Sequence, residues 1–174
     1  MTLYPILIAP HKALRRKAKP VAKIDKKTHT LLNDMVDTMY HARGIGLAAP
    51  QIGINKQLIV IHLEHEVGEP LKLINPELTQ TSGDMDIKQE GCLSLPDQFA
   101  DITRPVSCSV RYLDLAGESC TLDAQGLLAR CLQHEIDHLK GKLFVDYLSP
   151  VRRNMILRRS AKQKKTSSHA SHNA

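Results

Sequence analysis

The stretch His134-Glu135-Ile136-Asp137-His138 places two histidines four positions apart. In a helix this spacing puts both imidazoles on one face, one turn from each other, where they can reach a single metal ion. Glu135 lies beside them as a candidate general base. Histidine and glutamate are also common on solvated helix faces, so a surface helix without a metal is the alternative for this pattern taken alone.

A third metal ligand does not follow the histidine pair. Zinc peptidases with this spacing usually take that ligand from a later Glu or His. The chain has no glutamate after Glu135, and its only histidines beyond the motif, His169 and His172, lie in a polar tail. If there is a metal, its third ligand must therefore come from another part of the chain.

The chain has four cysteines, namely Cys92, Cys108, Cys120 and Cys131. Cys131 fails on geometry, because a helix rises roughly 10 Å from Cys131 to His138 at about 1.5 Å per residue. Three ligands spread over that distance cannot all lie about 2.0–2.3 Å from one ion, so Cys131 is expected in the core or in a wall of the site. Cys108 belongs to a segment that alternates apolar and polar residues and is expected in the core. Nothing distinguishes Cys120 chemically.

Cys92 has a more distinctive context, Glu90-Gly91-Cys92-Leu93-Ser94-Leu95-Pro96. The glycine before it allows the backbone to approach a ligand closely. Pro96 is expected to end the segment, which indicates a short ordered loop or a strand edge. Taken alone, the segment leaves two interpretations open, a metal ligand and a buried structural cysteine.

A third segment, Gly44-Ile45-Gly46-Leu47-Ala48-Ala49-Pro50-Gln51, lies between a helical pattern and an apolar strand. Glycine-rich loops often bind phosphate, but this one has neither G-K-[ST] nor the dinucleotide-binding spacing. The loop is small and apolar and ends in one amide side chain. That composition suits a backbone surface brought close to an extended peptide.

Together, in this order and at this spacing, the three segments resemble the peptide deformylase family. The family's motifs stand here as GIGLAAPQ at Gly44–Gln51, EGCLSLP at Glu90–Pro96 and QHEIDH at Gln133–His138, without a departure inside them. The resemblance covers roughly the first 150 residues. It implies a metal-dependent hydrolase that removes the formyl group from the N-terminal formyl-methionine of new polypeptides and releases formate.

The resemblance also implies a role for each motif residue. Glu135 is the acid/base, and the Gln51 side chain and the backbone N–H of Leu93 hold the oxyanion. The physiological metal is one ferrous ion, which nickel, cobalt or zinc readily replaces, because the Irving–Williams order favours nickel and zinc over iron. The implied metal ligands are Cys92, His134 and His138.

We expect the substrate to bind extended, as a strand against backbone near Ile45–Gly46 and near Gly91, where the glycines carry no blocking side chain. Its methionine should enter an apolar pocket lined by Ile45, Leu127 and Cys131, since methionine is long, flexible and polarizable. Glu90 is expected to orient the Cys92 loop, either by accepting a hydrogen bond or by pairing with an arginine such as Arg104. The alternative for Glu90 is a surface carboxylate.

Hydrophobic periodicity predicts helices at 28–42, 127–139 and 150–162. Gly44 and Gly141 are expected to end the first two, and Ser149-Pro150 supplies an N-cap and a first-turn proline for the third. Strands are expected at 57–63, 71–74, 106–113 and about 119–123. Because strands precede the metal-motif helix without regular βαβ alternation, we predict an α+β fold. Its small, mostly antiparallel sheets should surround a central metal-binding helix, with a C-terminal helix after it.

A chain of 174 residues is long enough for one domain with a substantial core. We expect a single catalytic domain over residues 1–165 and a polar, disordered tail over 166–174. No apolar run approaches the ~20 residues of a membrane-spanning helix, and the N-terminus lacks the features of a signal peptide. Four cysteines beside a thiolate metal motif indicate a reducing compartment. The resemblance to deformylases implies that this compartment is the bacterial cytoplasm.

The net charge of +6 is concentrated at the C-terminus. Seven Arg or Lys residues and no acid follow residue 150, so the rest of the chain is close to neutral. This basic region predicts electrostatic attraction to RNA, and we expect that RNA to belong to the ribosome, where the substrate emerges. The alternative is a solvated tail without a partner. The basic residues are Arg152, Arg153, Arg158, Arg159, Lys162, Lys164 and Lys165.

Two other functions compete with the deformylase interpretation. The first is a zinc peptidase that cleaves internal peptide bonds, which the absence of a later glutamate disfavours. The second is a structural metal site in an RNA-binding module, which would usually provide four protein ligands and would leave Glu135 and Gln51 without a purpose. Activity on formyl-peptides as against acetyl-peptides separates the first rival from a deformylase.

Overall fold

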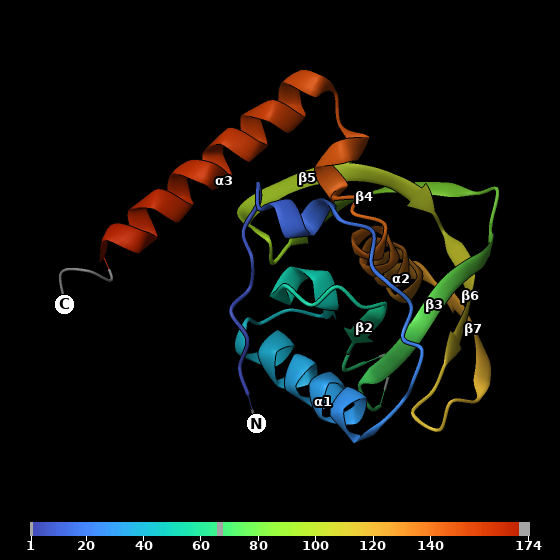
Figure 1. The fold of residues 1–174 in the computed structure, drawn as a ribbon. Coiled ribbons are helices and arrows are strands. Elements are labelled where there is room, and N and C mark those ends of the chain that lie inside the picture. Colours follow the sequence, from blue (N-terminus) through green and yellow to red (C-terminus); the bar gives the residue numbers. More distant parts are fainter. Residues whose placement is uncertain (1, 66–67, 171–174) are drawn as a thin grey trace.

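Seven strands and three α-helices form the part of the chain that the structure, a computed structural model, describes, residues 2–65 and 68–170 (Figure 1). The strands are β1 (Gly46–Ala48), β2 (Leu58–Ile61), β3 (Leu71–Thr81), β4 (Met85–Cys92), β5 (Leu95–Pro105), β6 (Ser107–Leu113) and β7 (Ser119–Gln125). The α-helices are α1 (Lys26–His41), α2 (Gly126–Leu139) and α3 (Pro150–Ala170). Three short 3-10 helices are η1 (Lys12–Arg15), η2 (Ala49–Ile52) and η3 (Phe144–Tyr147).

The strands form two separate sheets beside α2 (Figure 1). The larger sheet has the order β1-β2-β3-β6-β7, and the smaller sheet pairs β4 with β5. Every pairing between these strands is antiparallel. Helix α2 packs against strands of both sheets, which gives it the central position predicted from the sequence. The predicted α+β class is thereby confirmed.

Strand β2 lies between two hydrophobic cores. All four of its residues are fully buried, and they point alternately into one core and the other. Leu58 and Val60 pack in the cluster that contains the apolar face of α1. Ile59 and Ile61 alternate with them and pack in the cluster that contains the apolar residues of α2. Burial on both faces explains why this strand appears in the sequence as a continuous apolar run. The larger sheet thus carries α1 on one side and α2 on the other.

Helix α3 begins where the sequence predicts, since the Ser149 hydroxyl accepts a hydrogen bond from the Arg152 N–H at 3.4 Å. Ile156 is buried in a third core with β5 and η3, and the Ser160 hydroxyl donates to the Ala9 carbonyl at 3.0 Å. The helix continues to Ala170, beyond the predicted end at 162.

The expected domain boundary at 165 falls inside α3, and residues 171–174 lie outside the described residues, so that division stays a prediction. Among the described residues, none of the helices has the length and apolar character needed to cross a bilayer.

The end of α1 differs from the prediction that Gly44 stops the helix. The helix ends at His41, and the left-handed residue that closes it is Arg43, with φ 55°. Gly44 packs closely against Leu93, because a Cβ on it would lie 2.6 Å from Leu93 Cδ1. A larger residue at this position would have to displace the Leu93 side chain.

Of the two interpretations of the Cys92 segment, the strand edge is correct and the short loop is wrong, as is the expected end at Pro96. Cys92 ends the eight-residue strand β4, and Pro96 is the second residue of the eleven-residue strand β5. The register shifts between Gly91, which faces Phe99, and Cys92, which faces Leu95. That irregularity accommodates the proline, which is otherwise disfavoured inside a strand.

Candidate metal centre

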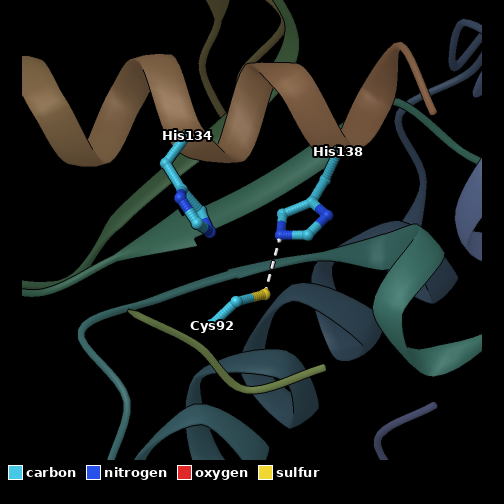
Figure 2. Close-up of side chains that lie close together, drawn as sticks. All are labelled: Cys92, His134 and His138. Carbon is cyan, nitrogen blue, oxygen red and sulfur yellow. Dashed lines mark hydrogen bonds between the residues drawn. The ribbon is translucent and has the colours of Figure 1, made fainter. Parts of the chain in front are cut away.

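Three side chains that could bind a metal converge at the end of β4. His134 and His138 point from one face of α2 toward Cys92, as Figure 2 shows. One ligand atom from each of the three residues lies within 4.8 Å of the others. Cys92 Sγ is 3.2 Å from His138 Nε2, and the two imidazole ring centroids are 5.0 Å apart. The structure therefore brings together the three residues that the sequence analysis expected as ligands.

The protonation chemistry of the two histidines fits a metal ion. Burial, together with the positive charges of His134 and Arg104, holds the pKa of His138 well below its ordinary value, so this imidazole is neutral and able to bind a metal. Burial alone would lower the pKa of His134, but its contacts with Cys92 and Glu90 hold that pKa well above its ordinary value. Metal binding must displace that proton. Two nitrogens and one sulfur suit iron, cobalt, nickel or zinc far better than magnesium or calcium.

Glu135 lies between the metal ligands and strand β1. Its carboxylate approaches Gly46 so closely that a Cβ there would be 2.5 Å from Glu135 Oε1 and 2.9 Å from Cys131 Sγ. Glu135 Oε2 is buried and has no hydrogen-bond partner among the described residues. Burial raises the pKa of Glu135 to about 7, a value suited to taking and returning a proton near neutral pH.

Gln51, on η2, is held with its amide nitrogen toward the metal ligands. Its Oε1 accepts a hydrogen bond from the Ala48 N–H at 2.8 Å, which fixes the orientation of the amide. Its Nε2 then donates to Ser94 Oγ at 3.2 Å and lies 3.5 Å from Cys92 Sγ. Leu93 occupies the turn between Cys92 and Ser94. Ser94, fully buried, was not anticipated from the sequence, where a serine in an apolar run gives no distinctive signal.

Glu90 is buried and accepts four hydrogen bonds from three cationic or potentially cationic side chains. Arg104 donates to both carboxylate oxygens, at 2.6 and 3.0 Å. Arg130 donates to Oε1 at 2.8 Å, and His134 Nδ1 lies 3.0 Å from Oε2. The predicted pair with Arg104 is confirmed, and a surface position for Glu90 is excluded. Because Nδ1 of His134 faces Glu90, its Nε2 is left for the metal.

The environment of Glu90 holds its carboxylate in the charged form. Burial alone would raise the pKa of Glu90, but hydrogen bonds from His134 and Arg104 and the charge of Arg104 lower it to about 2. The same guanidinium donates to Asp137 Oδ2 at 2.8 Å, and the Tyr147 hydroxyl donates to that oxygen at 2.7 Å. The network thus reaches from β4 and β5 through α2 to η3.

Arg130 is a further residue that the sequence analysis did not identify. Besides Glu90, its guanidinium binds the Ile102 carbonyl at 2.9 Å, the Asp86 carbonyl at 3.2 Å and the Asp86 carboxylate. Arg130 therefore ties both strands of the small sheet to α2. Its partners lie 28 to 44 residues away in sequence, so no local pattern could reveal it.

A cavity of about 580 Å³ opens beside the ligands. Ile45 and Leu127 are large apolar side chains that are nearly half exposed there. Phe99, 60% exposed, also lines this cavity and was not anticipated. Its ring fills the space that a side chain at Gly91 would need, since a Cβ there would lie 2.7 Å from Phe99 Cε1. The cavity is lined by all the residues expected to contact substrate, namely Ile45, Gly46, Gly91, Leu127 and Cys131.

Comparison with known proteins identifies the family. The sequence model described as polypeptide deformylase matches residues 3–154. The chain belongs to the polypeptide deformylase family. It is 47% identical over 168 residues to the peptide deformylase of Rhizobium meliloti (strain 1021), covering 95% of this chain and 97% of that protein. Identity to peptide deformylase 2 of Xanthomonas axonopodis pv. citri is 49% over 168 residues, covering 95% and 98% of the two chains.

Solved deformylase structures share the fold. The crystal structure of the Legionella pneumophila peptide deformylase has a TM-score of 0.90 at 45% identity, covering 96% of this chain and 98% of that one. The Ehrlichia chaffeensis enzyme in complex with actinonin also has a TM-score of 0.90, at 40% identity, covering 94% and 98% of the two chains. Deformylases are metal-dependent, and the cluster of Cys92, His134 and His138 is able to bind a metal.

Replacing the cysteine of this cluster tests the metal centre. Cys92→Ala should lower divalent-metal affinity by more than about 100-fold. Replacing a residue that only hydrogen-bonds to a metal ligand already lowers metal affinity by about 10–100-fold, and loss of a ligand should cost more. Metal content after competition with a chelator measures the effect. Cys108→Ala is the matched control, since Cys108 is buried in the core, where its thiol lies 3.7 Å from the Ala129 carbonyl. Equal metal retention by both variants would contradict the assignment of Cys92 as a ligand.

The charge of Glu90 should be essential to both the metal centre and the fold. Glu90→Gln keeps the shape but leaves two buried arginines, Arg104 and Arg130, with only Asp137 and Asp86 as anionic partners, so the free energy of unfolding should fall by up to about 3–5 kcal/mol. Metal affinity should fall about 10–100-fold, since Glu90 orients His134. Denaturant unfolding at fixed metal loading measures the first effect. Glu77→Gln, which removes an exposed ion pair with Arg111, should change stability by less than about 1 kcal/mol. Similar losses in both variants would show that the Glu90 network has no special role.

Proposed function

We propose that this chain is a metal-dependent hydrolase that removes the formyl group from the N-terminal formyl-methionine of new polypeptides and releases formate. The observation that carries the proposal is the convergence of Cys92, His134 and His138 on one point, with the buried carboxylate of Glu135 beside them. Membership of the deformylase family supports the same reaction. A structural metal site would need a fourth protein ligand and would not need Glu135.

We further propose that Cys92, His134 and His138 hold one ferrous ion. When bound, the ion would lower the pKa of a water molecule toward about 7 and would place positive charge near the oxygen that becomes negative. Nickel and zinc bind such a donor set more tightly than ferrous iron, so the ion in a purified sample need not be the one used in the cell.

Glu135 is positioned to move the proton that the reaction requires. Its carboxylate takes a proton from the attacking water and later delivers it to the leaving amine, so that formate and a free amino terminus are the products. Gln51 supplies its Nε2 hydrogens to the oxygen that becomes negative, because its Oε1 is already occupied by the Ala48 N–H. We assign the backbone N–H of Leu93 to the same oxygen.

The substrate peptide is proposed to bind as a strand between the two sheets. β1 is the edge strand of the larger sheet, and β4 pairs only with β5. Both line the cavity, so an extended peptide between them can hydrogen-bond to backbone on either side. The methionine side chain then lies against Ile45, Leu127 and Cys131. A formyl carbon bears hydrogen where other amides bear carbon, so a narrow site can exclude ordinary peptide bonds.

We propose that the enzyme works in the bacterial cytoplasm, close to the ribosome. The bacterial deformylases among the relatives and the four free cysteines support the location. The exposed positions of Arg158 and Arg159 on α3 support attraction to ribosomal RNA, since neither is needed for packing against the body.

Formate release tests the proposed reaction directly. The protein should release formate from a formyl-Met peptide and leave the acetyl-Met peptide uncleaved, with metal content measured on the same sample. A formyl-Asp peptide should react at least about tenfold more slowly, because a charged side chain is disfavoured in an apolar pocket. Glu135→Gln should retain the metal but lose at least about 100-fold in kcat, since it cannot accept the proton. Full turnover by Glu135→Gln, or cleavage inside the acetyl peptide, would refute the proposal.

Reversing the charge of the basic region tests ribosome attraction. Changing Arg158, Arg159, Lys162, Lys164 and Lys165 to Glu should weaken cosedimentation with ribosomes at low salt, because fewer counterions are released on contact. Turnover of a short formyl-peptide provides the control, since this region is not part of the cavity. Charge reversal is preferable to truncation at residue 150, which would also remove the packed residues Ile156 and Ser160. Undiminished cosedimentation would show that the region is only a solvated helix end.

A further inference from the structure

Arg43 holds a backbone conformation that residues with side chains rarely adopt. Its φ is 55°, in the left-handed region. Its N–H donates to the Tyr40 carbonyl at 2.9 Å, and the Gly44 N–H donates to the Met39 carbonyl at 2.9 Å. These two bonds form the Schellman arrangement that ends α1, in which the left-handed position is usually glycine. The chain therefore keeps a long cationic side chain at a position whose backbone conformation favours glycine.

The side chain of Arg43 is not used to hold the fold together. The residue is exposed, and its guanidinium makes no hydrogen bond or ion pair with a residue that the structure describes. Arg43 lines the substrate cavity and also a second hollow of about 480 Å³, which is bounded by Tyr40, His62 and Glu64. An unpaired cation thus stands where the two hollows meet.

One wall of the cavity leads from the metal centre along the chain to Arg43. Gly46 lies against Glu135, and the cavity is lined by residues 42–46 of this segment but not by the fully buried Leu47 and Ala48. The open path along the segment therefore runs from Gly46 back toward Arg43. If the methionine lies beside Ile45, the residue two positions further along an extended peptide lies beside Arg43.

We propose that Arg43 is a specificity-determining residue that favours an acidic side chain at the third residue of the formyl-peptide and disfavours lysine or arginine there. The inference rests on the proposed function. A carboxylate on the third residue pairs with the guanidinium of Arg43 at the junction of the two hollows, whereas an ammonium is repelled by it.

Two exposed acids line the same hollows and oppose this preference. Glu64 shares the second hollow with Arg43, and Asp97 lies on the rim of the substrate cavity. The preference is therefore confined to the substrate position nearest Arg43. It also follows that removing the charge of Glu64 should strengthen the selection for an acidic third residue.

Peptides of the form formyl-Met-Ala-Xaa-amide, with Asp, Asn or Lys as the third residue, test the proposal. The amide removes the terminal carboxylate that would otherwise compete for Arg43. The kcat/KM ratio of the Asp to the Lys peptide should be roughly 1.5-fold to fivefold in the parent, the range of exposed ion pairs, and should decrease at high salt. Arg43→Ala should bring the ratio to about 1 or below, because Glu64 and Asp97 remain. Arg43→Lys should retain most of the ratio, and Glu64→Gln should raise it. Ratios within one variant cancel effects common to all peptides.

Arg43→Gly separates this role from a structural one. Glycine relieves the left-handed backbone, so this variant should melt at a higher temperature than the parent while losing the Asp-to-Lys preference. A purely structural Arg43 would instead change stability or all three peptides alike and leave the ratio intact, which overturns the proposal. Turnover of the Asn peptide without discrimination between Asp and Lys overturns the Arg43 proposal alone. Failure to release formate from every peptide overturns it together with the proposed function.

Discussion

The buried carboxylate of Glu90 holds together the two parts of the molecule on which the metal centre depends. Cys92 comes from a two-stranded sheet that makes no strand pairing with the larger sheet, whereas both histidines come from α2. Arg104 and Arg130 bind Glu90 from β5 and α2, and His134 binds its other side. Buried charges are tolerated only when they are paired and their hydrogen-bonding capacity is used. The same requirement therefore fixes the small sheet, the helix and one ligand in a single arrangement.

The central position of α2 gives every residue of the His134–His138 stretch a separate task. His134 and His138 face Cys92, and Glu135 faces strand β1. Ile136 packs in the core between α2 and the larger sheet, and Asp137 accepts hydrogen bonds from Arg104 and Tyr147. A surface helix would leave one of these directions to solvent. α2 instead has neighbours on all these sides, which explains why the polar side chains of Glu135, Asp137 and His138 are buried as well as the apolar ones.

The sequence predicted those features whose cause is local or carried by a motif. The helix that carries His134 and His138 follows from periodicity and from Gly141, and strand β2 follows from an apolar run. Strands β4 and β5 outside the Cys92 motif were missed, because Glu90 and Arg104 occupy inward positions where an apolar residue would be expected. Pro96 also hid the start of β5. The positions of Ser94 and Arg130 could not be inferred, since their partners are more than 25 residues distant in sequence.

The distribution of unsatisfied polar groups singles out the proposed site independently of any motif. Among the described residues, the buried side-chain atoms without a hydrogen-bond partner are Glu135 Oε2 and His138 Nδ1, both at the metal centre. Folding normally pairs such atoms, because leaving them unpaired in a low-dielectric interior is destabilising. Here the neighbouring network of Glu90, Arg104 and Arg130 is paired and binds His134, the residue next to Glu135, whereas the Glu135 carboxylate keeps one oxygen without a partner. The paired network of Glu90, Arg104 and Arg130 therefore stabilises the fold beside the proposed site. This stability can offset the cost of leaving the buried Glu135 carboxylate without a full set of hydrogen bonds.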